Sequence, residues 1–155
     1  LLQFAAEAGA MIGLNTTDFG CPDVRRAGIF GARAGLAFQL QDDVLGLFGE
    51  EADTGKSASS DLRRGKYTVI IAETLSTAKP DDAKRLNKCL GNPDLDDKDL
   101  KWVRKLVEET GTRERVTKRG KELVEEARTC LAKFPDNPYR SRLEAWTDFL
   151  VDRSA

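Results

Sequence analysis

Apolar residues in this chain recur every three or four positions, and runs that alternate apolar and polar residues are nearly absent. Segment 95–110 shows the pattern, with one helical face that carries Leu100, Val103, Leu106 and Val107. A period of 3.6 residues is typical of a helix packed on one side, whereas a period of two is typical of a strand. The sequence therefore predicts an all-α protein.

About seven helices are expected, separated by loops that contain Gly, Pro and helix-capping residues. Segment 1–14 is apolar almost all round, which predicts a helix buried on most sides. Segment 67–75 contains Val-Ile-Ile and favours a strand by composition, but no second strand exists to pair with it, so we predict a buried helix. The remaining helices are expected at 22–48, 80–90, 95–110, 112–134 and around Leu143, Trp146, Phe149 and Leu150.

Small residues gather in the first half of the long segment 22–48, with glycine at positions 28, 31 and 35. Each glycine inside a helix costs about 1 kcal/mol relative to alanine. Such a cost is usually offset where something approaches the backbone closely. A neighbouring helix and a ligand are the two candidates.

The composition excludes several classes of function. The chain has 155 residues, the size of one domain, and a formal net charge of -1, which argues against general nucleic-acid binding. It contains no histidine, so Ser-His-Asp and Cys-His nucleophiles and His-ligated zinc are excluded. No apolar run reaches the 18–20 or so residues that a membrane span requires.

Three cysteines, Cys21, Cys89 and Cys130, lie far apart and form no C-x-x-C pair. This usage favours a reduced, cytoplasmic protein whose cysteines pack as small apolar residues. No charged leader precedes an apolar stretch near the start of the sequence, which indicates no signal peptide.

An acidic pair, Asp42-Asp43, is the strongest candidate for chemistry. Gln39 and Gly46 share a helical face with it, and the surrounding residues are apolar. Adjacent carboxylates in such a setting repel each other and lose hydration, and no basic residue lies three or four positions away to compensate. Magnesium would compensate, because it takes carboxylate oxygens and retains several waters.

The segment that follows supplies the opposite charge. Lys56 and Lys66, with Arg63 or Arg64, could fold back over the carboxylates. Each basic residue alone is more typical of a solvated loop. Together with a divalent cation they describe a site for a polyanion, and a diphosphate is its natural ligand.

The stretch GLAFQLQDDVLGLFGEEADTGKSASSDLRRGKYTVIIAETL, Gly35 to Leu75, resembles the second aspartate-rich region of the trans-isoprenyl diphosphate synthases, the polyprenyl synthetase family. The shared elements are F-Q, D-D, T-G-K, D-L-R and G-K-x-T, in that order. The resemblance implies an antiparallel helix bundle of the isoprenoid synthase type around a deep apolar cavity. It also implies head-to-tail condensation of isopentenyl diphosphate with an allylic diphosphate, assisted by Mg2+.

The resemblance also assigns roles to residues. Asp42 and Asp43 would hold Mg2+, and Asp61 would hold metal-bound water. Lys56 and Lys66 would bind the allylic diphosphate, Gln39 would contact the same group, and Phe38 would line the pocket. The family forms dimers through helices near the start of this chain, so a homodimer is expected.

Two departures from the family pattern matter. The second motif is often D-D-x-x-D, but its fifth place here is Gly46. A first aspartate-rich motif is absent, since Asp96-Asp97 lies in a turn after Pro93, on the wrong side of the second motif in the sequence. We therefore expect residues 1–155 to be the C-terminal part of a single polyprenyl synthetase domain, inactive in isolation.

Two other readings stay open. A non-catalytic helical subunit or interaction module with the same fold would explain the absent first motif, but it does not readily explain the carboxylates and lysines. A terpene cyclase of similar architecture is less compatible with the T-G-K and D-L-R-x-G-K elements. Product chain length and the allylic substrate cannot be read from this sequence.

Overall fold

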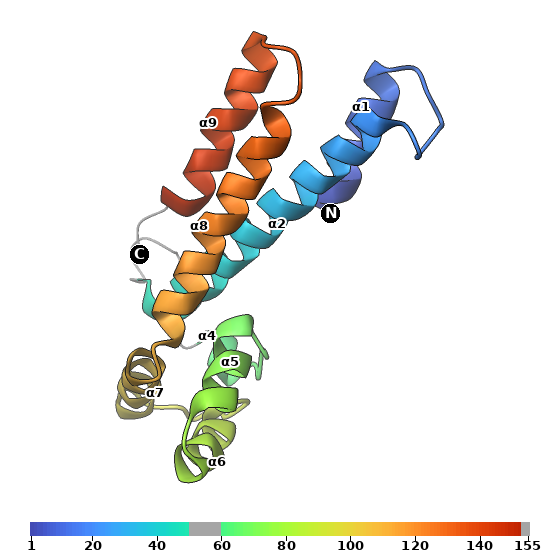
Figure 1. Ribbon diagram of the computed structural model, residues 1–155. Coiled ribbons are helices and arrows are strands. Elements are labelled where there is room, and N and C mark those ends of the chain that lie inside the picture. The colour runs from blue at the N-terminus through green and yellow to red at the C-terminus, as the bar shows by residue number, and fades with distance from the viewer. Residues whose placement is uncertain (50–59, 153–155) are drawn as a thin grey trace. The chain divides into compact units, whose positions relative to one another are not determined.

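The computed structural model describes residues 1–49 and 60–152, and eight helices are assigned within them (Figure 1). They are α1 (Leu2–Gly13), α2 (Pro22–Phe48), α4 (Ser60–Arg63), α5 (Val69–Thr77), α6 (Pro80–Cys89), α7 (Asp97–Glu109), α8 (Thr112–Leu131) and α9 (Pro138–Asp152). Across these ranges there is no strand, so the predicted all-α class is confirmed. None of these helices is long and apolar enough to cross a membrane.

The boundaries follow local sequence signals. The Val-Ile-Ile segment lies in helix α5, so the prediction that it is helical is confirmed. Thr68 caps this helix, and its hydroxyl accepts a hydrogen bond from the Ile71 N–H at 3.4 Å. Segment 60–66 is part helix and part turn. Residues 60–63 form the short helix α4, and the chain then turns at Gly65, whose φ is 68°.

The helices divide into two compact units. The first, here called the bundle unit, comprises Leu1–Gln39 with the described part of Arg119–Arg153. The second, called the site unit, comprises Leu40–Lys118. The long helices α2 and α8 each begin in one unit and end in the other.

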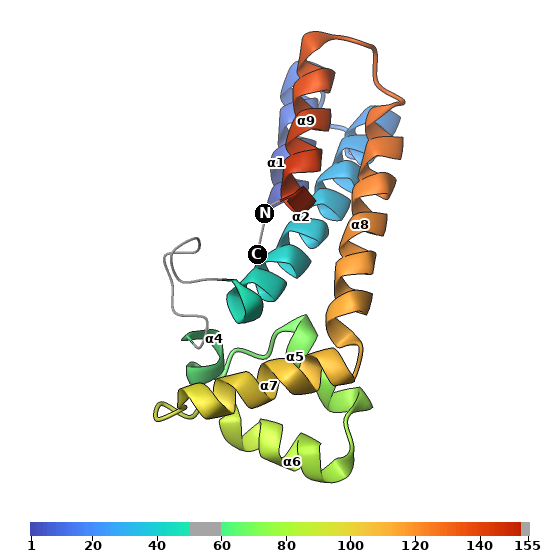
Figure 2. The same cartoon turned by 90° about the vertical axis from the view of Figure 1, so that its left-hand side faces the viewer.

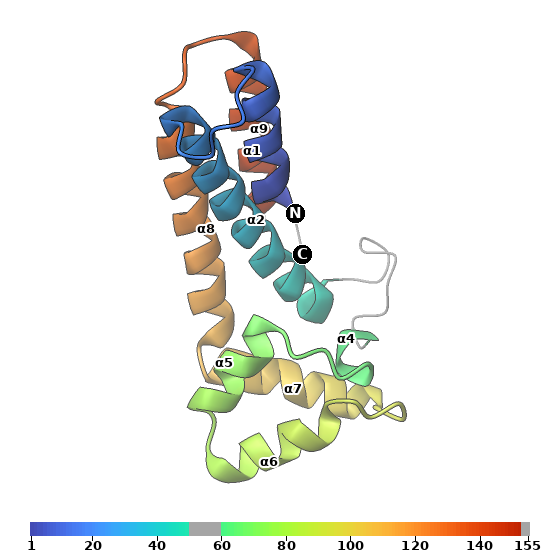
Figure 3. The same cartoon turned by 90° about the vertical axis from the view of Figure 1, so that its right-hand side faces the viewer.

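Within the bundle unit, α1 runs antiparallel to the first part of α2, and the last part of α8 runs antiparallel to α9 (Figures 2 and 3). All four helices contribute to one apolar cluster. Its buried members are Phe30, Ala34, Ala127, Leu131 and Leu150. The ring of Phe30 meets that of Trp146 edge-on, with 6.4 Å between centroids. The antiparallel helix bundle that was predicted is therefore confirmed in this unit.

The glycines of α2 admit α1. A Cβ atom at Gly31 would lie 2.6 Å from the Leu2 carbonyl oxygen and 2.9 Å from the Ala6 Cβ, closer than real Cβ contacts allow. A Cβ atom at Gly28 would likewise meet the Glu7 side chain. The approach predicted from the small residues is therefore made by a neighbouring helix.

The prediction that segment 1–14 is buried on most sides is wrong for this chain. No residue of α1 is buried, and Phe4 and Ile12 are 70% and 80% exposed. The reason is geometric, because α1 packs on the small-residue face of α2 along one side. The rest of its apolar circumference is left open.

Within the site unit, α5, α6 and α7 contact one another. Val103, Leu106 and Val107 of the predicted apolar stripe are buried, and Leu100 is half-buried. Cys89 is a buried free thiol, and burial raises its pKa.

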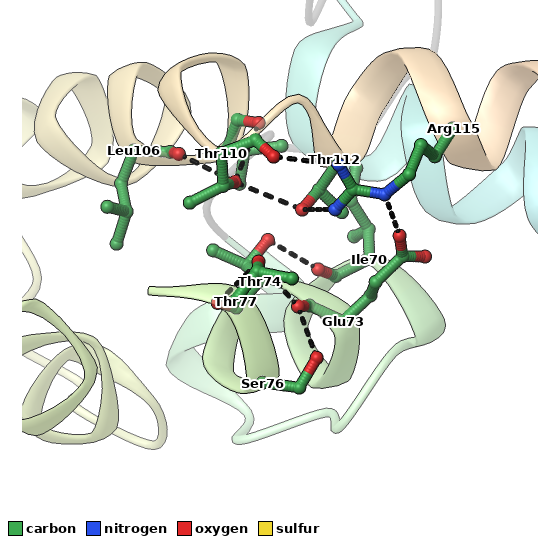
Figure 4. Close-up of polar contacts among 10 residues, drawn as sticks. Ile70, Glu73, Thr74, Ser76, Thr77, Leu106, Thr110, Thr112 and Arg115 are labelled. Carbon is green, nitrogen blue, oxygen red and sulfur yellow. Dashed lines mark hydrogen bonds and ion pairs between the residues drawn. The ribbon is translucent and has the colours of Figure 1, made fainter. Parts of the chain in front are cut away.

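A polar cluster fastens α5 to the junction of α7 and α8 (Figure 4). Arg115 at the start of α8 pairs with Glu73 of α5 and donates to the Thr110 carbonyl at 2.8 Å. The hydroxyl of Thr74, fully buried, donates to the Ile70 carbonyl at 2.7 Å, which satisfies its hydrogen-bonding need inside the core. These contacts orient the helix whose first turn reaches the candidate site.

Leu131→Ala should destabilise the fold strongly, because the leucine is 1% exposed at the centre of the bundle cluster. Loss of its buried methyl groups and the cavity that remains predict a decrease of about 2–5 kcal/mol in the free energy of unfolding. Urea denaturation followed by circular dichroism measures this. Leu143→Ala is the control, since Leu143 is 42% exposed, and it should cost less than about 1 kcal/mol. Equal losses would contradict the assigned core.

Candidate functional site

The last turns of α2 place Asp43 against the start of α5. Asp43 is only 4% exposed, and its Oδ2 accepts a hydrogen bond from the Val69 N–H at 3.2 Å. Val69 is the first residue of α5, where backbone N–H groups lack partners within the helix and carry partial positive charge. The carboxylate is therefore stabilised in part by the end of a second helix.

The turn after α4 brings two further predicted residues to Asp43. The Lys66 N–H donates to the Asp61 carbonyl at 2.9 Å, and Gly65 between them has the positive φ that closes such a turn. The Lys66 ammonium lies 2.9 Å from Asp61 Oδ2 and 3.5 Å from Asp43 Oδ1. One cationic group thus contacts carboxylates from two helices.

The charge of Lys66 is reinforced by these contacts. Its hydrogen bond to Asp61, aided by the negative charges of Asp61 and Asp43, raises the pKa of the ammonium despite partial desolvation. A raised pKa means that the pairing is fully present at neutral pH and is lost only as pH rises through the folded-state value.

Gly46 makes room for Asp61. A Cβ atom at position 46 would lie 3.2 Å from Asp61 Oδ2, a tight contact for any side chain. The Asp61 carboxylate therefore lies beside α2 at Gly46, which is about one helical turn beyond Asp43. Sequence reasoning noted Gly46 as a departure but missed this contact, although a glycine inside a helix is a signal of close approach.

A small hollow opens at this point of the site unit. Its charged residues are Asp43, Asp61 and Lys66, and its apolar walls include Leu47, Leu62, Ile70 and Ile71. Apolar walls limit hydration, so charges placed here interact more strongly than they would at an open surface.

The other predicted residues lie in different surroundings. Asp42 is half-buried, and its side chain makes no hydrogen bond or ion pair with another residue that the structure describes. Phe38 is half-buried and Gln39 is exposed, both in the segment of α2 that belongs to the bundle unit. Lys56 lies outside the described residues.

Of the two arginines predicted near the carboxylates, Arg63 is held elsewhere. Its guanidinium donates to the Leu95 carbonyl at 2.8 Å. Arg64 is exposed. Lys66 is therefore the basic residue of this turn that the structure brings to the acids.

Two arginines that sequence reasoning missed secure the end of α2. The Arg104 Nε donates to the Leu47 carbonyl at 2.7 Å, which satisfies one of the carbonyls left unpaired at a helix C-terminus. The Arg113 guanidinium lies over the Phe48 ring at 4.2 Å from its centroid. Neither carries a sequence signal, because the contacts join segments more than 50 residues apart.

The donor set is compatible with a hard divalent cation. In the part of the chain that the structure describes, no group of three or more acidic, Cys or His side chains surrounds a common point. At this hollow, Asp43 and Asp61 both contact the Lys66 ammonium. Mg2+ is suited to such a set, since it commonly takes one or two carboxylates and completes its shell with water and phosphate oxygens.

Comparison with known proteins identifies the family. The polyprenyl synthetase family model matches residues 1–107, and the chain belongs to this family. It is 32% identical over 149 residues to a geranylfarnesyl diphosphate synthase from Aeropyrum pernix, which covers 95% of this chain and 46% of that protein. It is 39% identical over 101 residues to a geranylgeranyl diphosphate synthase from Sulfolobus acidocaldarius, which covers 64% of this chain and 29% of the relative.

Solved structures agree on the all-α isoprenoid synthase fold. A geranylgeranyl pyrophosphate synthetase from Pyrococcus horikoshii matches with a TM-score of 0.86 and 29% identity over 99% of this chain and 45% of its own. A polyprenyl synthase from Caulobacter crescentus, complexed with calcium and isoprenyl diphosphate, matches with a TM-score of 0.83 and 30% identity, with coverages of 99% and 46%. The chain thus spans less than half the length of these proteins.

Gly46→Ala should fail to give the usual gain of alanine over glycine. In a helix interior that gain is about 1 kcal/mol, but here the new Cβ presses on the Asp61 carboxylate and moves it from Lys66. Urea denaturation should show no gain or a net loss. The control is Gly120→Ala in α8, where a Cβ meets nothing within 4 Å and the full gain is expected. Equal stabilisation by both substitutions would contradict the assigned contact.

Proposed function

We propose that this chain is part of a Mg2+-dependent trans-prenyltransferase that condenses isopentenyl diphosphate with an allylic diphosphate. The observation that carries the proposal is the convergence of Asp43, Asp61 and Lys66 on one hollow, in a chain of the polyprenyl synthetase family. The names of the relatives, which are geranylfarnesyl and geranylgeranyl diphosphate synthases, support the same reaction class.

In the proposed reaction, the bond between the allylic carbon and oxygen breaks, and the diphosphate leaves with the electron pair. The double bond of isopentenyl diphosphate then attacks the allylic cation, a carbon–carbon bond forms, and a proton is lost. The barrier lies mainly in the charge separation of the first step, so groups that stabilise the departing negative charge accelerate it.

The chain's own residues have distinct proposed roles. Asp42 and Asp43 would hold Mg2+, and Asp61 would hold the cation or its water. When bound, Mg2+ would neutralise negative charge on the diphosphate. Lys66 would bind the allylic diphosphate from the other side, together with Lys56. Gln39 and Phe38, which precede the acidic pair on α2, would contact the diphosphate and line the pocket.

Residues 1–155 are proposed to be a C-terminal part of a single polyprenyl synthetase domain. The coverage of its relatives, which is below one half, supports this assignment. The complete enzyme is proposed to be a cytoplasmic homodimer. The exposed apolar side of α1 supports a dimer contact near the start of the chain.

A non-catalytic helical subunit is the second candidate. The observation that favours it is the pairing of Asp43 within the chain, since its carboxylate already accepts from Val69 and contacts Lys66. In this reading the acids serve the fold alone, and no cation or diphosphate would bind. Binding experiments separate the two candidates.

Asp43→Asn should weaken Mg2+-dependent binding of a non-hydrolysable diphosphate analogue by about ten- to a hundredfold, the effect of losing one charged ligand in a partly buried site. Isothermal titration calorimetry with and without Mg2+ measures this. The control is Asp81→Asn, because the Asp81 side chain is 97% exposed on α6, and its affinity should stay unchanged. Absence of Mg2+-dependent binding to the unmodified chain would support the non-catalytic reading instead.

Turnover should require more than residues 1–155. A single carboxylate cluster cannot hold the full set of metal ions, so the 155-residue chain alone should show no condensation of isopentenyl diphosphate with geranyl diphosphate. In a complete synthase that contains this segment, Asp42→Ala and Asp43→Ala should each lower turnover by orders of magnitude. Full activity of the isolated chain, or unchanged rates in the variants, would overturn this prediction.

A further inference from the structure

We propose that Lys66 is an internal counter-ion that occupies the position of a divalent cation between Asp43 and Asp61. Cation binding then displaces the ammonium from these carboxylates and frees it for an anionic ligand. The inference rests on the proposed function for the identity of the cation. It assigns Lys66 two successive partners, of which the structure shows the first.

The Lys66 ammonium bridges the two acids. The Lys66 ammonium contacts one oxygen of each acid, Asp43 Oδ1 at 3.5 Å and Asp61 Oδ2 at 2.9 Å. The second oxygen of Asp43 accepts from the Val69 N–H at 3.2 Å, which fixes the orientation of the carboxylate. The ammonium thus contacts the Asp43 oxygen that the Val69 N–H does not.

The charges of Asp43 and Asp61 are shared with Lys66. The two carboxylates carry one negative charge each, and the Lys66 ammonium that contacts both carries one positive charge. A divalent cation would balance both acids, and it requires oxygens at about 2.0–2.1 Å if it is Mg2+. Such a cation and the ammonium would compete for the same oxygens and repel each other at that range, so both cannot stay.

The Lys66 side chain is exposed enough to move away from the acids. The side chain is 42% exposed, whereas that of Asp43 is 3% exposed. A lysine has a flexible four-carbon stem and a compact charge, so the ammonium can swing towards solvent while the backbone turn at Gly65 stays closed. The buried Asp43 carboxylate therefore stays in place, and the Lys66 ammonium is the group that a metal ion can replace.

The consequence is a coupling between the two ligands. A cation that enters without diphosphate must displace Lys66 and receives no compensation for the ion pairs lost. When diphosphate is present, the released ammonium has a new anionic partner. The cation should therefore bind more tightly in the presence of diphosphate, and Lys66 should be a source of that coupling.

The test measures Mn2+ binding by calorimetry, because Mn2+ favours the same carboxylate ligands as Mg2+. Without diphosphate, Lys66→Met should bind Mn2+ more tightly than the unmodified chain by roughly fivefold, the equivalent of one ion pair. With inorganic diphosphate present, the same variant should bind Mn2+ and diphosphate more weakly than the unmodified chain. The sign of the effect thus reverses between the two conditions.

Two further variants control the measurement. Arg64→Met removes one positive charge two residues away and should change Mn2+ affinity less than twofold, because exposed charges are screened. Lys66→Arg keeps the charge and should retain the weaker, unmodified affinity. Circular dichroism verifies that each variant is folded.

The outcomes separate the inference from the proposed function. Equal Mn2+ affinity of Lys66→Met and the unmodified chain, with Mn2+ bound by both, would overturn the counter-ion role and leave the metal site intact. Equal tightening by Lys66→Met and Arg64→Met would also overturn it, because only general charge would then matter. Failure of every variant to bind Mn2+ would overturn both the inference and the proposed metal site.

Discussion

A carboxylate with almost no exposed surface must be compensated by its surroundings, and Asp43 is the residue on which this site depends. The chain compensates it with the first N–H of α5 and the ammonium of Lys66. These two partners come from one stretch of chain that follows α4, so the burial of Asp43 also fixes where that stretch lies against α2. The same compensation lines a small hollow with the charged groups of Asp43, Asp61 and Lys66.

Two glycines, Gly46 and Gly65, are needed to shape the scaffold around the hollow. Gly46 admits the Asp61 carboxylate, and Gly65 adopts the left-handed conformation that brings Asp61 and Lys66 together. Arg104 secures the end of α2, while Arg115 and Glu73 secure α5 (Figure 4). The charged residues are therefore positioned by contacts from four separate helices.

Much of this was predictable from the sequence, and the reasons for the exceptions are physical. The helical period located the stripe of α7, and the motif elements placed Asp43, Asp61 and Lys66 among the candidate site residues, which the structure brings into contact. The exposure of α1 was not predictable, because apolar character does not reveal how many neighbours a helix has. The contact between Gly46 and Asp61 was also missed, since a spacing of fifteen residues reveals no contact until the turn between them is known.

The central claim is that the Asp43 carboxylate is a cation ligand, and that the Lys66 ammonium occupies the cation's position until the cation binds. The most direct measurement is a crystal structure of the protein with Mn2+ and diphosphate, with anomalous scattering used to locate the metal. The account predicts an anomalous peak within coordination distance of the Asp43 carboxylate, with the Lys66 ammonium moved from the acids to a diphosphate oxygen. A metal bound elsewhere, with Lys66 still between Asp43 and Asp61, would contradict it.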